Sequence, residues 1–172
     1  MTKPHKAIKP NMAKIPVPDV RFSSLQIDVV GPLPPSEGMT YLLSIWDRTT
    51  RWWEAVPMKE ATAKSSCDAF LRGWVQRFGL PQLVTSDNGN TFISKMWQEM
   101  HKTLGSEVSF TPPYHSQSLG GVERQHLDLK NGLKAALYRM GDESGAGWMQ
   151  QLPWVLLGKR TAMCQDPSRK LC

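Results

Sequence analysis

Apolar and polar positions alternate in a way that predicts strands in the first third of the domain. A β-rich run at 24–30 ends at Gly31, where a strand cannot continue into the following prolines. Two more β-rich runs, 41–46 and 52–58, are separated by the short polar segment 47–51. This spacing predicts an antiparallel hairpin, so three strands are expected in succession.

The later part of the chain predicts helices alternating with strands. Residues 61–78 carry apolar side chains at the three-to-four spacing of an amphipathic helix that ends at Gly79. The remaining elements expected are a strand at 82–86, a helix at 91–104, a strand at 107–111, and helices at 121–140 and 148–163. A helical crossover returns a strand parallel to an earlier one, so we expect an α/β fold. Its five-stranded mixed sheet has three antiparallel strands, then two reached through helices, and is flanked by helices on both faces.

The length of 172 residues suits one domain with tails. We expect an extended basic linker at 1–21, the folded domain at 22–163 and a C-terminal tail at 164–172. The net charge is +6, but four lysines precede the first acidic residue, which leaves only +2 for the rest. The basic leader is therefore either a solvated tail or a segment that contacts phosphates.

Cysteine usage and hydropathy point to a soluble protein. Cys67, Cys164 and Cys172 are far apart and lack the spacing of a zinc site, so reduced thiols are expected. The sequence shows neither a secretory signal nor an apolar run of the roughly 20 residues that a membrane helix needs. We expect a protein that is not secreted and has no membrane partner.

Three carboxylates are the candidates for chemistry, and each also has an ordinary structural interpretation. Asp28 lies within an apolar run, where it needs a partner unless it faces solvent. Asp87 ends a strand and begins a turn-forming sequence, so it suits a turn or a helix cap. Glu123 lies in a first helical turn, where the helix dipole favours an acid.

The combination of these positions changes the balance. Ligands of open α/β sheets gather at strand ends, and carboxylates that converge there repel each other strongly enough to require cations. Because all three ligands offer oxygen, magnesium or manganese is expected. No Ser, Cys or His nucleophile is convincing, and scattered His5, His101, His115 and His126 are interpreted as solvated side chains.

The strings around these acids resemble the D,D-35-E motifs of retroviral integrases, most closely the Gypsy-type retrotransposon branch. Residues 88–122, which number 35, separate Asp87 from Glu123. The strings themselves are IDVVGPLP (27–34), TSDNGNTF (85–92) and YHSQSLGGVER (114–124). The similarity extends from about residue 14 to 163.

The resemblance implies an RNase H-like fold in which Asp28, Asp87 and Glu123 bind two Mg²⁺ or Mn²⁺ ions. The implied reactions are DNA 3′-end processing and strand transfer by a homo-oligomer in the nucleus, with DNA and no small molecule as substrate. It also implies DNA contacts at Tyr114, Gln117 and Lys130. Lys130 and Lys134 lie on the same helical face as Glu123, where they either approach phosphates or form a solvated face.

Two other interpretations stay open. A non-catalytic nucleic-acid-binding or interaction remnant is favoured by Leu119, where related integrases usually have Asn or Gln, and by the absence of the modules that flank the core in full-length integrases. The chain also ends before the last core helix of the family is expected to finish. A different RNase H-like nuclease or transposase is disfavoured by the spacing and the flanking strings.

Overall fold

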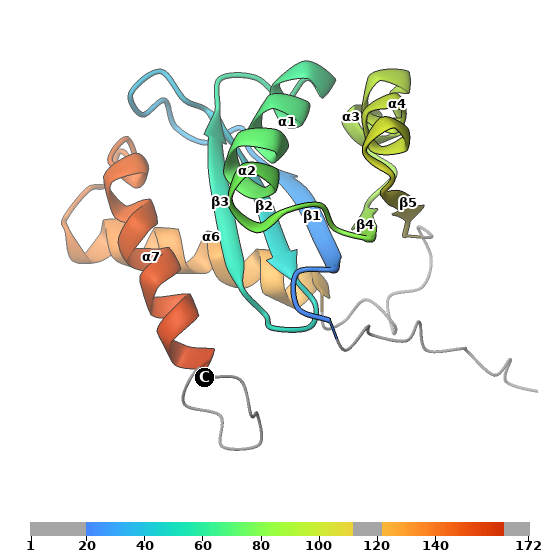
Figure 1. The fold of residues 1–172 in the computed structure, drawn as a ribbon. Coiled ribbons are helices and arrows are strands. Elements are labelled where there is room, and N and C mark those ends of the chain that lie inside the picture. Colours follow the sequence, from blue (N-terminus) through green and yellow to red (C-terminus); the bar gives the residue numbers. More distant parts are fainter. Residues whose placement is uncertain (1–19, 112–121, 164–172) are drawn as a thin grey trace, which may run out of the picture.

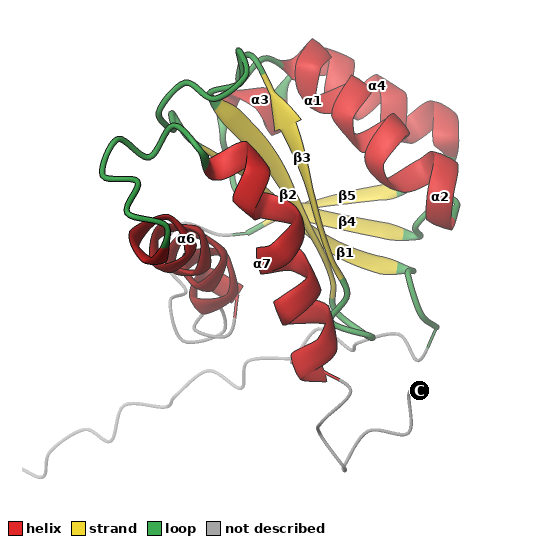
Figure 2. Cartoon of the chain, turned by 90° about the vertical axis from the view of Figure 1, so that its left-hand side faces the viewer, coloured by secondary structure: helices red, strands yellow, loops and turns green. Residues whose placement is uncertain are grey.

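A twisted five-stranded sheet forms the centre of the molecule. The computed structural model describes residues 20–111 and 122–163, without the side chains of 122–126, 162 and 163. The strands are β1 (Ser24–Val30), β2 (Tyr41–Asp47), β3 (Trp53–Met58), β4 (Leu83–Ser86) and β5 (Glu107–Phe110). They lie in the order β3-β2-β1-β4-β5, with the first three antiparallel and with β4 and β5 parallel to β1 (Figure 2). The predicted mixed sheet is confirmed.

Helices cover both faces of this sheet. They are α1 (Ala63–Phe70), the π-helical turn η1 (Leu71–Val75), α2 (Gln76–Phe78), α3 (Asn90–Ile93), α4 (Lys95–Leu104), α6 (Val122–Arg139) and α7 (Trp148–Met163). Helices α1 to α4 lie on one side, and α6 and α7 lie on the other (Figures 1 and 2). None of the helices within the described ranges is long and apolar enough to span a membrane.

Alternation along β1 divides its side chains between two apolar cores. Leu25 and Ile27 pack in the core beneath α1 and α4, with Trp74 and Trp97. Val30 belongs to the opposite core, which it shares with residues of α6 and α7. Even-numbered Asp28 therefore faces the α6 side of the sheet, as strand alternation requires.

Two of the predicted helices differ in detail. The helix expected at 61–78 contains the π turn η1, within which Gly73 packs directly on Val56 of β3, an approach that only a glycine allows. The helix expected at 91–104 is interrupted at Ser94, whose backbone is extended. The Ser94 hydroxyl accepts a hydrogen bond from the Trp97 amide, so a new helix begins there.

A buried ion-pair network holds helices from both faces to the edge strand β3. Glu54 is only 4% exposed, and its two oxygens lie 3.0 Å from Arg77 Nη1 and 2.8 Å from Arg160 Nη2. Trp52 Nε1 donates to the same carboxylate, and Arg160 Nε donates to the Trp53 carbonyl. A charge in this position is tolerated because each oxygen has a cationic partner.

The environment of His101 corrects one prediction. This side chain was expected to be solvated, but it is fully buried between Phe70 and Trp97. Neither ring nitrogen has a hydrogen-bond partner among the described residues. Burial lowers the pKa of His101 to about 4, so the ring is neutral and acts as a core side chain.

Candidate metal centre

Strand register brings Asp28 and Asp87 side by side. Gln26 of β1 pairs with Thr85 of β4, and Asp28 and Asp87 lie two residues further along the two parallel chains. Adjacent strands are about 4.8 Å apart, and residues at equal steps from a pair point to the same face. Both side chains therefore lie near the end of β4, close enough for the Asp87 charge to act on the Asp28 carboxyl.

Asp28 occupies a partly buried position in the middle of the sheet. Its backbone pairs with Ser44 of β2, and the Ser44 hydroxyl donates a 3.0 Å hydrogen bond to the Asp28 carbonyl. Burial and, to a smaller extent, the negative charge of Asp87 raise the pKa of Asp28, which comes to about 6. The positive charge of Lys130 and the Val29 amide oppose this rise. Ionising Asp28 therefore costs more than ionising an aspartate in water, and additional positive charge nearby would lower that cost.

Asp87 combines a structural contact with an exposed position. One of its oxygens accepts a 3.0 Å hydrogen bond from the Gly89 amide, which fixes the turn between β4 and α3. The first residue of α3 is Asn90, and Gly89 rather than Asp87 occupies the N-cap. The turn interpretation of Asp87 is therefore correct and the helix-cap interpretation is wrong.

The third acid is placed only by its backbone. Glu123 lies in the first turn of α6, but its side chain is outside the described set. Among the described residues no group of three His, Cys, Asp or Glu side chains converges on a metal position. Tyr114 and Gln117 also lie outside the described residues, so their predicted DNA contacts stay predictions.

The two predicted lysines project from the exposed side of α6. Lys130 is close enough for its charge to lower the pKa of Asp28, which places a cation beside the paired acids. Lys134 lies one turn further along and borders, with Lys130, a cavity of about 470 Å³. The sequence did not predict the apolar walls of this cavity. Helical spacing shows that one face of a helix is apolar, but it does not show whether that face packs in a core or lines a groove.

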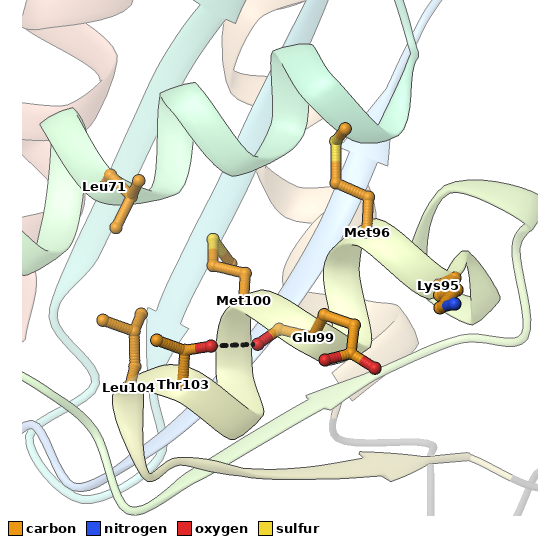
Figure 3. Close-up of a pocket in the computed structure, with 7 residues that line it drawn as sticks. All are labelled: Leu71, Lys95, Met96, Glu99, Met100, Thr103 and Leu104. Carbon is orange, nitrogen blue, oxygen red and sulfur yellow. Dashed lines mark hydrogen bonds between the residues drawn. The ribbon is translucent and has the colours of Figure 1, made fainter.

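A second depression lies on the other side of the sheet and has no place in this site. It has a volume of about 540 Å³ and lies between η1 and α4, lined by Leu71, Met96, Met100 and Leu104 (Figure 3). Its polar rim includes Glu99, whose carbonyl accepts the Thr103 hydroxyl at 2.8 Å. This contact is ordinary bonding within a helix, and the depression is separated from Asp28 by the sheet.

Known proteins share both sequence and fold with this chain. The family model described as the integrase core domain matches residues 21–116. The Gag-Pol polyprotein of Walleye dermal sarcoma virus is 33% identical over 145 residues, or 84% of this chain. The Pro-Pol polyprotein of Simian foamy virus type 3 is 30% identical over 168 residues, or 98% of this chain. The chain spans 8% and 13% of these two polyproteins.

Solved structures give the same result for the fold. The catalytic core domain of BIV integrase is 26% identical, with a TM-score of 0.59 over 80% of this chain and 82% of that one. The HTLV-2 integrase catalytic core in complex with magnesium has a TM-score of 0.61 at 21% identity, covering 80% and 85% of the two chains. A simian T-cell lymphotropic virus intasome chain reaches 0.67 at 20% identity, covering 86% and 53%.

Proposed function

Because this chain belongs to the integrase core family, we propose that it catalyses metal-dependent 3′-end processing and strand transfer on DNA. The observation that supports the proposal is that Asp28 and Asp87 each follow the paired residues Gln26 and Thr85 by two positions, and that the Asp87 charge acts on Asp28. Glu123, in the first turn of α6, is the third proposed ligand. An RNase H-like fold with helices on both faces supports this assignment.

The residues present fit a divalent cation. Two carboxylates share one face of the sheet, and the charge of Asp87 contributes to the raised pKa of Asp28, so added positive charge is favoured there. Hard oxygen ligands suit Mg²⁺ or Mn²⁺. Held by these carboxylates, such ions would supply positive charge for an in-line displacement at phosphorus. The magnesium complex of the HTLV-2 core is consistent with this choice.

The protein residues hold and orient the substrate. Asp28, Asp87 and Glu123 would hold the ions. Lys130, whose charge acts on Asp28, would bind a phosphate of the DNA strand that reacts there. In processing, a water oxygen bonds to phosphorus as the bond to the 3′ oxygen breaks. In strand transfer, the liberated 3′-hydroxyl attacks target DNA in the same way. No side-chain nucleophile is required.

The partners follow from this reaction. Insertion of two DNA ends needs at least two active sites, so we propose a homo-oligomer that acts on chromosomal DNA in the nucleus. Dimeric and trimeric forms of the HTLV-2 core support self-association. The relatedness to part of an intasome supports DNA as the partner.

A metal titration tests the proposal. We expect Mg²⁺ and Mn²⁺ to raise the thermal midpoint of the wild-type protein and not that of Asp87→Asn. Asparagine keeps an oxygen for the Gly89 amide, so the turn survives while the charge is lost. Glu99→Gln, an exposed acid across the sheet, is the matched control and should respond like wild type.

A branched DNA substrate then tests the chemistry. In the presence of Mg²⁺ or Mn²⁺, wild type and Glu99→Gln should reverse strand transfer on this substrate, which frees the attached DNA end and rejoins the target strand. Asp87→Asn should form neither product. A folded wild-type protein without metal response or product would overturn the proposal and favour the non-catalytic nucleic-acid-binding or interaction protein. Cleavage without strand joining would instead indicate an RNase H-like nuclease.

A further inference from the structure

A preformed groove extends along α6 away from the paired carboxylates. The α6 groove, as we call it, has a volume of about 470 Å³ and lies between the second half of α6, Leu33 and Pro34 after β1, and the segment 141–145. This volume falls within the range that binds small organic groups. Apolar side chains form its walls, namely Leu33, Leu133, Leu137 and Trp148.

The two ends of the α6 groove carry opposite charge. Lys130 and Lys134 border the end nearer Asp28, since the Lys130 charge acts on that carboxyl. Asp142 and Glu143 border the other end. Tyr138, which is 87% exposed, lies one helical turn beyond Lys134 along the same edge. An occupant that matches these residues has an anionic end, an apolar body and hydrogen-bond donors at the far side.

The acidic end is held rigid by its own hydrogen bonds. The Asp142 carboxylate accepts from the Ser144 hydroxyl at 2.6 Å, the Gly145 amide at 3.0 Å and the Gly147 amide at 2.7 Å. Trp148 Nε1 donates to the Pro34 carbonyl at 2.8 Å, which joins this segment to the chain after β1. Because Asp142 is engaged, exposed Glu143 is the acceptor that can face an occupant.

We propose that the α6 groove binds one unpaired nucleotide of the DNA substrate, with its phosphate on Lys130 and Lys134, its base on the apolar wall and its exocyclic amine toward Glu143. The inference rests on the proposed function, because DNA held at the metal centre is what supplies the nucleotide. Only a base released from stacking offers both faces to apolar and aromatic side chains. A carboxylate acceptor favours cytosine or adenine over thymine, which lacks an amine.

The test compares DNA hairpins of one sequence that end blunt or carry a single unpaired dA, dC or dT at the 5′ end or the 3′ end. Affinity is measured by fluorescence anisotropy in EDTA at fixed salt, so that no metal chemistry contributes. For one of the two ends we expect unpaired dA or dC to tighten binding about fivefold or more, with a smaller gain for dT.

Variants locate the effect. Leu137→Trp, which fills the α6 groove, should abolish the gain and leave blunt-end affinity unchanged. Tyr138→Ala removes an exposed side chain that the fold does not need, and it should reduce the gain. Glu143→Ala should remove the preference for dC over dT. Its matched control, Glu99→Ala, should keep that preference.

The outcomes separate the two proposals. Equal affinity for blunt and extended hairpins, or a full gain in Leu137→Trp, would overturn the groove assignment and leave the proposed function standing. An equal rise in affinity for every probe in Glu143→Ala would show simple charge repulsion and overturn the base contact. Failure to bind any hairpin would overturn the proposed function and the inference with it.

Discussion

Arg160 of α7 lies 2.8 Å from the buried Glu54 carboxylate, so one side chain attaches the last described helix to the edge strand of the sheet. Arg77 reaches the other Glu54 oxygen from the opposite face. A single carboxylate thereby connects the two helical layers, although it lies far from the proposed chemistry. Its contribution should be visible in stability rather than in activity.

Glu54→Ala should lower the free energy of unfolding by about 2–3 kcal/mol, because partly buried Arg160 loses its partner, whereas half-exposed Arg77 can be hydrated. Chemical denaturation measures this change. Lys64→Ala is the control, since it breaks an exposed ion pair with Asp68 and should cost at most about 0.5 kcal/mol. Similar losses in the two variants would show that Glu54 is not the critical partner.

Acid should destabilise the protein through His101. Its folded-state pKa of about 4 lies below the usual 6.5, so the unfolded chain takes up the proton first. Stability from this group is present above pH 6.5 and is lost as pH falls toward 4, by about 2–3 kcal/mol. Denaturation between pH 7 and 4.5 should show a shallower loss in His101→Leu, and parallel curves would contradict the assignment.

The metal-free protein should gain stability from Asp28→Asn at pH 7.5. The folded-state pKa of Asp28 is raised to about 6, so the ionised form opposes folding, and stability rises as pH falls from 6 toward 3.8. Replacing the charge should stabilise the fold by about 1–3 kcal/mol. Unfolding in EDTA checks this, and a destabilised Asp28→Asn would show that the charge is compensated within the protein.

The response to Mg²⁺ should weaken in acid, because protons compete for the same carboxylate. With the pKa of Asp28 near 6, the Mg²⁺ concentration that gives half of the thermal stabilisation should be nearly constant above pH 7 and rise steeply at pH 5.5. Asp28→Asn should show no response at either pH. If the Mg²⁺ concentration for half of the thermal stabilisation were the same at pH 5.5 as at pH 7, Asp28 would be excluded as a ligand.

Local patterns were sufficient to predict most element boundaries, because alternation, helical spacing and turn residues act over a few positions. Strand β1 and helix α7 have the predicted bounds, whereas the interruption at Ser94 depends on one side chain replacing a backbone partner. The burial of His101 had a signal, since it lies four residues after Trp97 on the same apolar face.

Long-range relationships were less accessible. The resemblance named Asp28 and Asp87, but their alignment depends on pairing between strands that a helical crossover separates. The Glu54 partners lie in two different helices, and local spacing gives no hint of either. The α6 groove depends on how segment 141–145 meets Pro34, where a side chain at Gly145 would come within 3.1 Å of the proline ring.

The pairing of β1 with β4 also determines which length changes the site can survive. Deleting one residue within β4 before Asp87 would turn its carboxylate to the opposite face, while every ligand identity stayed the same. Additional residues in the exposed turn between β3 and α1 would leave that pairing intact. The position of a length change therefore matters more than its size. A change of one residue within the paired strands would disrupt the site, whereas a change of the same size in an exposed turn would not.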